Sequence, residues 1–311
     1  MTDTKTTTDY DAIIIGSGAA GYTAALYAVR YKLKTLVIGL QEGGQGALAH
    51  DIENYPGFVS IKGVDLMNKF KESAVAYGTE TKMDEVNKIE KNADNTYSIS
   101  LTYSGETLTA KTVLLALGTK NRKLGAIGED KFYGKGVTYC ATCDGMFFKE
   151  KTVGIVGAGD SAVTAAIYMA DLCPKVYLFV RKDKMRAEPI WQEKLQEKDN
   201  IEVVYNTSIG EFAGDTKLEK VISTDGKEFT LDGCFIEIGA DPNTALLDSF
   251  NIEKDNHGYI VVDKEQALPN NAGFFSAGDV TTGSNHFHQV ATAVGEGAVA
   301  ANSMFNYVSK F

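Results

Sequence analysis

The sequence predicts an α/β fold in which one strand, turn and helix unit occurs twice along 311 residues. The first copy starts with an apolar run at 10–15 that leads into a glycine-rich turn at 16–21. The second copy starts with an apolar run at 152–156 that leads into a similar turn at 157–162. Because the chain is longer than one average domain, we expect two Rossmann-like, three-layer domains, each of which binds a dinucleotide.

The first turn reads Gly-Ser-Gly-Ala-Ala-Gly, and an Ala-rich segment at 22–30 follows it as a predicted helix. Glycines permit a tight turn and close approach of phosphate, and a helix N-terminus offers unpaired amides. The residues expected to bind here are Gly16, Gly18, Ala19, Ala20 and Gly21. The next strand, 35–38, ends without the usual acidic ribose ligand. Either Glu42 binds the ribose from the loop, or the backbone makes this contact and Glu42 is a solvated loop residue.

The second turn repeats this logic and precedes a predicted helix at 163–172, with alanine in place of the third glycine. The residues expected to bind here are Gly157, Gly159, Asp160, Ser161 and Ala162. After the next strand, 176–180, an NAD site would place a carboxylate, whereas this chain has Arg181, Lys182 and Arg186. Cations at this position fit the 2′-phosphate of NADPH. The alternative is a solvated, charged surface loop.

Two cysteines, Cys140 and Cys143, lie shortly before the second turn. At this spacing they can close a disulfide and reopen it by thiolate attack, which suits the transfer of two electrons. A zinc site is disfavoured, because structural zinc needs four clustered ligands and the remaining cysteines, Cys173 and Cys234, are solitary. We expect both of these to be core residues and no metal to bind. Two inert core cysteines at 140 and 143 are the remaining alternative.

Near the C-terminus, a predicted strand at 273–280 contains Gly278 and Asp279, and a predicted Ala-rich helix follows at 289–304. An aspartate at a strand end can accept a hydrogen bond from a ribityl hydroxyl, and the helix N-terminus can stabilise a reduced, anionic flavin. These features predict one flavin site and one nicotinamide site. The alternative is that Asp279 only caps the helix.

Composition limits the remaining classes of function. The formal charge of −10 argues against non-specific nucleic-acid binding, which needs a basic surface. No apolar run reaches the roughly 18 residues needed to span a membrane, and the polar start at 2–8 does not resemble a secretory signal. We therefore expect a cytoplasmic protein with no nucleic-acid or membrane partner.

Taken together, these motifs resemble those of the low-molecular-weight thioredoxin reductases over about 10–309. The matching motifs, in chain order, are Gly16 to Gly21, Gly43-Gly44-Gln45, Glu53 to Gly57, Leu117-Gly118-Thr119, Cys140 to Gly145, Gly157 to Ala162, Gly239 to Asn243, and Gly278-Asp279. The resemblance implies a discontinuous FAD-binding domain, 1–119 and 244–311. An NADPH-binding domain, 120–243, is inserted between these parts and carries the cysteine pair.

The resemblance also implies a mechanism, in which electrons pass from NADPH to FAD, to the Cys140–Cys143 disulfide and then to thioredoxin or a thioredoxin-like protein. Cys143 is the expected flavin-proximal sulfur, Cys140 attacks the partner, and Asp144 is the general acid. The alternative for Asp144 is a carboxylate at a helix start that backbone amides stabilise. The expected flavin pocket contains Gly18, Ala19, Gly44, Gln45, Asn54, Gly118, Gly278, Asp279, His288 and Gln289. The family implies a homodimer.

This chain departs from the family pattern at three positions. Val180 and Lys182 replace the usual His and Arg of the basic motif, and lysine keeps the charge but loses the planar fork of arginine. His288 replaces an arginine at the flavin edge, where it either alters the flavin potential or is a satisfied surface or interface histidine. NADPH stays the favoured donor, with a weaker preference over NADH, and ferredoxin or a reduced deazaflavin is a further alternative. A flavin dithiol oxidase that uses oxygen and a flavin-binding redox sensor are further alternatives.

Overall fold

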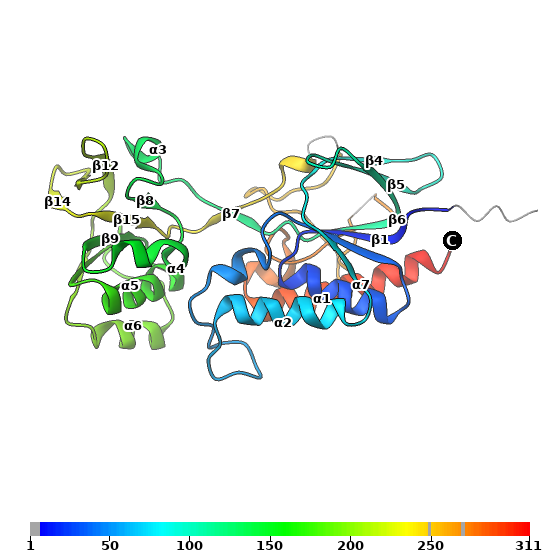
Figure 1. Ribbon diagram of the computed structural model, residues 1–311, viewed down its shortest axis with the longest axis horizontal. Coiled ribbons are helices and arrows are strands. Elements are labelled where there is room, and N and C mark those ends of the chain that lie inside the picture. The colour runs from blue at the N-terminus through cyan, green and yellow to red at the C-terminus, as the bar shows by residue number, and fades with distance from the viewer. Residues whose placement is uncertain (1–6, 248–249, 269–270) are drawn as a thin grey trace, which may run out of the picture. The chain divides into compact units, whose positions relative to one another are not determined.

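The computed structural model describes residues 7–247, 250–268 and 271–311 (Figure 1). The chain divides into two compact units. Unit 1 contains Met1–Ala47, Asp51–Lys120 and Pro242–Phe311, and unit 2 contains Leu48–His50 and Asn121–Asp241. The segments that join the units, β7 (Thr119–Asn121) and β16 (Ala240–Pro242), pair with each other.

Unit 1 is built on a mixed sheet with strand order β3-β2-β1-β6-β5-β4, and β17 lies beside β6. Its strands are β1 (Tyr10–Ile15), β2 (Thr35–Ile38), β3 (Glu80–Lys82), β4 (Val86–Lys91), β5 (Tyr97–Leu101), β6 (Thr107–Leu115) and β17 (Phe274–Ser276). The apolar runs of β1 and β2 are buried on both faces and pair in parallel, as such runs do in α/β sheets. In β5, fully buried residues alternate with partly exposed ones, and this strand pairs in antiparallel fashion with β4 and β6.

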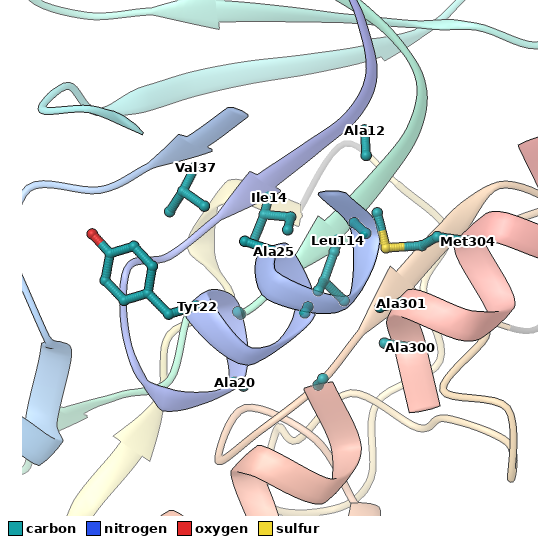
Figure 2. Close-up of a cluster of buried hydrophobic side chains, with 14 of the residues drawn as sticks. Ala12, Ile14, Ala20, Tyr22, Ala25, Val37, Leu114, Ala300, Ala301 and Met304 are labelled. Atoms are coloured by element: carbon teal, nitrogen blue, oxygen red, sulfur yellow. The ribbon is translucent and has the colours of Figure 1, made fainter. Parts of the chain in front are cut away.

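The helices of unit 1 are α1 (Ala19–Arg30), α2 (Gly63–Val75) and α7 (Val290–Val308), with short 3-10 turns at Gly44–Leu48, Ala245–Leu247 and Gly283–His286. Small residues let α1 and α7 lie against each other and against the sheet (Figure 2). A Cβ atom at Gly297 of α7 would lie 2.3 Å from the carbonyl oxygen of Ala20 in α1. Ala300, Ala301 and Met304 complete this fully buried contact.

Unit 2 has a parallel sheet with strand order β11-β10-β9-β15-β8 and a separate antiparallel sheet, β12-β13-β14. Its strands are β8 (Val137–Thr138), β9 (Thr152–Val156), β10 (Lys175–Phe179), β11 (Ile201–Val204), β12 (Ile209–Ala213), β13 (Lys220–Ser223), β14 (Glu228–Thr230) and β15 (Gly233–Ile236). Its helices are α3 (Glu129–Phe132), α4 (Ala141–Asp144), α5 (Asp160–Leu172) and α6 (Pro189–Gln196), with a 3-10 turn at Gly145–Phe148.

Several element boundaries differ from the sequence predictions. Both helices that follow the glycine turns begin three residues early, because Gly18 and Gly159 are extended and act as the N-caps of α1 and α5. The predicted strand at 273–280 is shorter, since β17 ends at Ser276 and Gly278 adopts a φ of +83°. Helix α7 continues past 304 to Val308. Within the described residues, no helix is long and apolar enough to cross a membrane.

Candidate active site and cofactor sites

The cysteine pair of unit 2 is closed as a disulfide between Cys140 and Cys143, with 5.4 Å between their Cα atoms. Cys140 is the N-cap of α4, and its Sγ accepts a hydrogen bond of 3.1 Å from the N–H of Cys143. Cys143 is exposed, and Cys140 is partly exposed. A disulfide on one turn at the protein surface is accessible to exchange with the thiols of another molecule.

The other two cysteines are buried, as predicted for core residues. Burial raises the pKa of the Cys173 thiol and, more strongly, that of the Cys234 thiol, so neither forms the reactive thiolate readily. Among residues 7–247, 250–268 and 271–311, no group of three or more His, Cys, Asp or Glu side chains is arranged to hold a metal ion.

Asp144 is the last residue of α4, and its carboxyl is tied to the strand that precedes the cysteines. The Thr138 hydroxyl donates to Oδ2 of Asp144 and accepts a hydrogen bond of 3.3 Å from the N–H of Cys140. The N–H of Asp144 donates to the carbonyl of Cys140 at 3.2 Å. The predicted acid and both sulfurs therefore belong to one hydrogen-bonded turn.

Two further carboxyls lie near this turn, and sequence analysis missed both. Glu237 directly follows β15, and its removal from water raises its pKa to about 8, against the opposing effect of a hydrogen bond from the Ala141 amide. Glu129 is buried and accepts hydrogen bonds from the N–H groups of residues 124, 125 and 126 and from the Tyr139 hydroxyl. A glutamate that ends an apolar run was the available signal for Glu237, whereas Glu129 had none.

The first glycine turn is shaped by close backbone contacts in unit 1. Gly16 has a φ of +118°, and a Cβ atom there would lie 2.0 Å from the carbonyl oxygen of Ala116. A Cβ atom at Gly21 would lie 2.0 Å from the carbonyl oxygen of Gly16. By contrast, the nearest atom to a Cβ at Gly18 is 3.9 Å away, and no side chain caps α1. The start of α1 therefore has room and unpaired amides for a phosphate.

The structure places the remaining predicted flavin residues at several points of unit 1. Asn54 Nδ2 donates to Gln289 Oε1 at 2.9 Å, and Gln289 is the N-cap of α7. Gln45 Nε2 donates to the Thr119 carbonyl at 3.1 Å. Gly44 lies beside Gly18, since a Cβ atom on Gly44 would be 3.4 Å from the Gly18 Cα.

Two polar groups near the C-terminal end of β17 have no hydrogen-bond partner within the described part of the chain. The carboxyl of Asp279 has no hydrogen-bond partner among these residues. Burial raises the pKa of this carboxyl, while the nearby His288 opposes the shift. The Nε2 atom of His288 is buried and also has no such partner. Buried polar groups are normally satisfied, so these orphaned groups fit a polar ligand such as a flavin.

Two more of the predicted residues have defined partners. Glu42 accepts hydrogen bonds from the Tyr22 hydroxyl and, at 2.6 Å, from Lys71 Nζ, so its carboxylate is held at the surface beside α1. The Gly118 carbonyl accepts from the N–H of Asn243 at 3.1 Å, where the two joining segments meet. The ribose role of Glu42 stays a prediction.

The second glycine turn is shaped in the same way in unit 2. A Cβ atom at Gly157 would lie 2.2 Å from the carbonyl oxygen of Glu237, whereas a Cβ at Gly159 would meet nothing within 4 Å. Asp160 begins α5, and its carboxyl accepts a hydrogen bond of 2.7 Å from the Glu188 amide. Ser161 is exposed, and Ala162 is buried under the turn.

The cationic loop after β10 folds back onto this turn. The N–H of Arg186 donates to the carbonyl of Ala158 at 2.6 Å, which places the loop beside the glycines. Arg181, Lys182 and Arg186 are exposed, and none of them forms an ion pair within the described ranges. Unpaired cations beside a helix N-terminus suit a ligand with several phosphates.

The fold and the disulfide define an oxidoreductase with two dinucleotide-binding units and a redox-active cysteine pair. The family model described as pyridine nucleotide-disulphide oxidoreductase matches residues 10–297, and the chain belongs to this family. Membership implies a flavin and a nicotinamide cofactor. Solved thioredoxin reductase structures that are similar to this chain confirm the α/β fold with two dinucleotide-binding domains.

Relatives and solved structures support the same assignment. The chain is 41% identical to a thioredoxin reductase of Treponema pallidum over 97% of this chain and 98% of the relative. It is similar to a thioredoxin reductase structure from Lactococcus lactis, with a TM-score of 0.91, 35% identity and coverage of 97% and 100%. It is also similar to a ferredoxin-flavin thioredoxin reductase from Clostridium acetobutylicum, with a TM-score of 0.53, 34% identity and coverage of 97% and 99%. The predicted resemblance is confirmed.

Proposed function

We propose that this protein is a thioredoxin reductase that carries electrons from NADPH through FAD to the Cys140–Cys143 disulfide and on to a thioredoxin. The disulfide on an accessible turn is the observation that carries this proposal, because it provides the redox group that such a reaction needs. The thioredoxin reductases among its relatives match it over nearly the whole chain. Bound FAD supplies the hydride-accepting and electron-donating chemistry.

The roles of the cysteine-bearing turn follow from its chemistry. The thiolate of Cys140 attacks the partner disulfide, and Cys143 then attacks the mixed disulfide and closes the ring again. Asp144 gives a proton to the partner sulfur that is released when the partner disulfide breaks. We assign FAD to residues 1–119 and 244–311 and NADPH to 120–243, since each contains one of the two glycine turns.

NADPH is the proposed donor because of the loop at 181–186. Its unpaired cations lie after the second strand of the nucleotide unit, and the amide of Arg186 binds the turn itself. An arginine or lysine at this point provides charge-assisted hydrogen bonds to a 2′-phosphate, which NADH lacks. Ferredoxin is the second candidate donor, because a ferredoxin-flavin thioredoxin reductase is about as similar in sequence as the other solved relatives. We also propose a homodimer in the cytoplasm.

The test is anaerobic reduction of the flavin, followed by its absorbance, with NADPH and NADH in separate experiments. We expect NADPH to bleach the flavin at much lower concentration than NADH. Arg181→Ala and Lys182→Ala should each raise the KM for NADPH about tenfold and that for NADH less than twofold, because about 1.4 kcal/mol of binding is lost per phosphate contact. Lys184→Ala, in the same loop, is the matched control and should change neither. Bleaching only by reduced ferredoxin would overturn NADPH as donor.

A further inference from the structure

The hydroxyl of Thr138 makes two hydrogen bonds that together determine its orientation. A hydroxyl has one hydrogen to donate and two lone pairs that accept. Here the hydrogen is given to Oδ2 of Asp144, and a lone pair accepts the N–H of Cys140 at 3.3 Å. Because a hydroxyl that accepts a bond becomes a better donor, the two bonds strengthen each other.

This arrangement makes the two oxygens of the Asp144 carboxyl different. Oδ2 already accepts the hydrogen of Thr138, and this bond makes Oδ2 the weaker base of the two oxygens, so a proton bound to the carboxyl is favoured at Oδ1. Within the described part of the chain, no hydrogen bond to Oδ1 occurs. One oxygen is therefore held in place, and the other has no hydrogen bond that competes with a proton.

The position of Thr138 in the fold also suits it to fix the orientation of the Asp144 carboxyl. It lies in β8, where it pairs with Phe235 of β15, and its side chain is 5% exposed. Groups held by strands are positioned more accurately than groups held by loops. Asp144, by contrast, lies at the end of a short helix and is partly exposed.

We propose that Thr138 is a positioning residue for disulfide exchange, which holds Oδ2 of Asp144 so that Oδ1 carries the transferred proton. This proposal rests on the proposed role of Asp144 as the general acid. When Cys140 attacks the partner disulfide, one enzyme–partner S–S bond forms and the partner S–S bond breaks. The leaving sulfur takes the proton from Oδ1. When Cys143 then attacks Cys140, the Cys140–Cys143 S–S bond forms and the Cys140–partner S–S bond breaks. Cys143 returns its thiol proton to Asp144, the second partner sulfur leaves as a thiolate that takes its proton from water, and two electrons have passed to the partner.

The test compares Thr138→Val, Thr138→Ser and Asp144→Asn in the flavin-loaded protein, with reduction of thioredoxin disulfide as the assay. Valine keeps the branched shape of threonine but has no hydroxyl, whereas serine keeps the hydroxyl. We expect Thr138→Val to lower kcat about tenfold with KM changed less than twofold. Thr138→Ser should restore most of this loss. In an Asp144→Asn background, Thr138→Val should change kcat less than twofold, because its effect acts through the carboxyl.

Flavin absorbance per chain and the melting temperature show whether each variant is folded. If Asp144→Asn keeps native kcat, the proposed acid is wrong, and the role of Thr138 is overturned with it. If Asp144→Asn lowers kcat and Thr138→Val keeps the native kcat, the proposed role of Asp144 is supported and the inference about Thr138 is overturned. A slow Thr138→Val that serine does not rescue, with additive losses in the double variant, would show a purely structural role and would also overturn it.

Discussion

The two glycine turns of this chain share one backbone arrangement but differ in the side chains around it. In unit 1 the turn between β1 and α1 packs against the carbonyl of Ala116, which follows β6. In unit 2 the turn between β9 and α5 packs against the carbonyl of Glu237, which follows β15. In both turns, a Cβ atom at the first glycine would clash with a backbone carbonyl, whereas a Cβ atom at the N-cap glycine would have space. The strand-to-helix geometry is therefore set by backbone contacts.

Three side-chain positions distinguish the turns. Unit 1 has Gly21 where unit 2 has Ala162, and only the latter position has room for a methyl group. Ala116 corresponds to Glu237, a carboxyl withdrawn from water. After the second strand, unit 1 has Glu42 and unit 2 has the cations that begin at Arg181. We therefore expect the glycine turn to permit a dinucleotide to bind, and the side chains around it to determine which dinucleotide is bound.

The largest effect should follow from disrupting the close contact between the first glycine of a turn and the neighbouring backbone carbonyl, which occurs in both units. In Gly16→Ala, the new Cβ atom would meet the Ala116 carbonyl at 2.0 Å and the φ of +118° would be strained. We expect a loss of about 3 kcal/mol or more in the free energy of unfolding, together with loss of bound flavin. Urea unfolding and flavin absorbance per chain measure both.

Gly78→Ala is the matched control, because Gly78 has a similar φ of +101° but no atom within 4 Å of the added Cβ. It should cost only the conformational strain, about 1–2 kcal/mol, and leave the flavin bound. Equal losses in the two variants would show that the contact with Ala116 contributes nothing beyond the backbone angle.

The next effect should come from the carboxyl that distinguishes unit 2. The pKa of Glu237 is raised from 4.5 to about 8, so the folded protein holds a proton that the unfolded chain releases. Stability should therefore fall as pH rises from about 4.5 to about 8, and Glu237→Gln should remove this loss. At pH 8 we expect the variant to be about 3 kcal/mol more stable than the native protein, and at pH 5 to be nearly equal.

Urea unfolding at pH 5, 6, 7 and 8 measures this difference. Glu193→Gln, at an exposed position of α6, is the control and should give a constant difference across the series. A parallel pH dependence of the native protein and Glu237→Gln would mean that Glu237 is ionised in the folded protein.

The features that sequence predicted are those recorded in short, contiguous patterns. Both glycine turns and the cysteine pair depend on spacing within about six residues, and the structure forms each of them locally. Sequence analysis places the starts of α1 and α5 three residues late, because residues 19–21 and 160–162 belong to the glycine-turn motifs although the glycine before each set is already the N-cap.

The features that sequence did not predict depend on residues brought together by folding. Thr138 precedes the cysteines without any motif, and its role appears only when its hydroxyl is seen between Cys140 and Asp144. Glu129 is a charged residue that reads as solvated until the amides of residues 124–126 surround it. Glu237 differs from a surface glutamate only in its surroundings.

The smallest effect concerns Glu42, the counterpart of the cationic loop. Its carboxylate oxygens accept from Tyr22 and Lys71, and each oxygen keeps a lone pair for a ribose hydroxyl. We expect Glu42→Ala to weaken FAD retention about fivefold, which corresponds to roughly 1 kcal/mol. Lys71→Met breaks the same half-exposed ion pair but leaves the carboxylate, and should change FAD retention less than twofold. Equilibrium dialysis of FAD distinguishes them: equal retention in both variants would make Glu42 a surface residue, and the ribose contact would then fall to the backbone of unit 1.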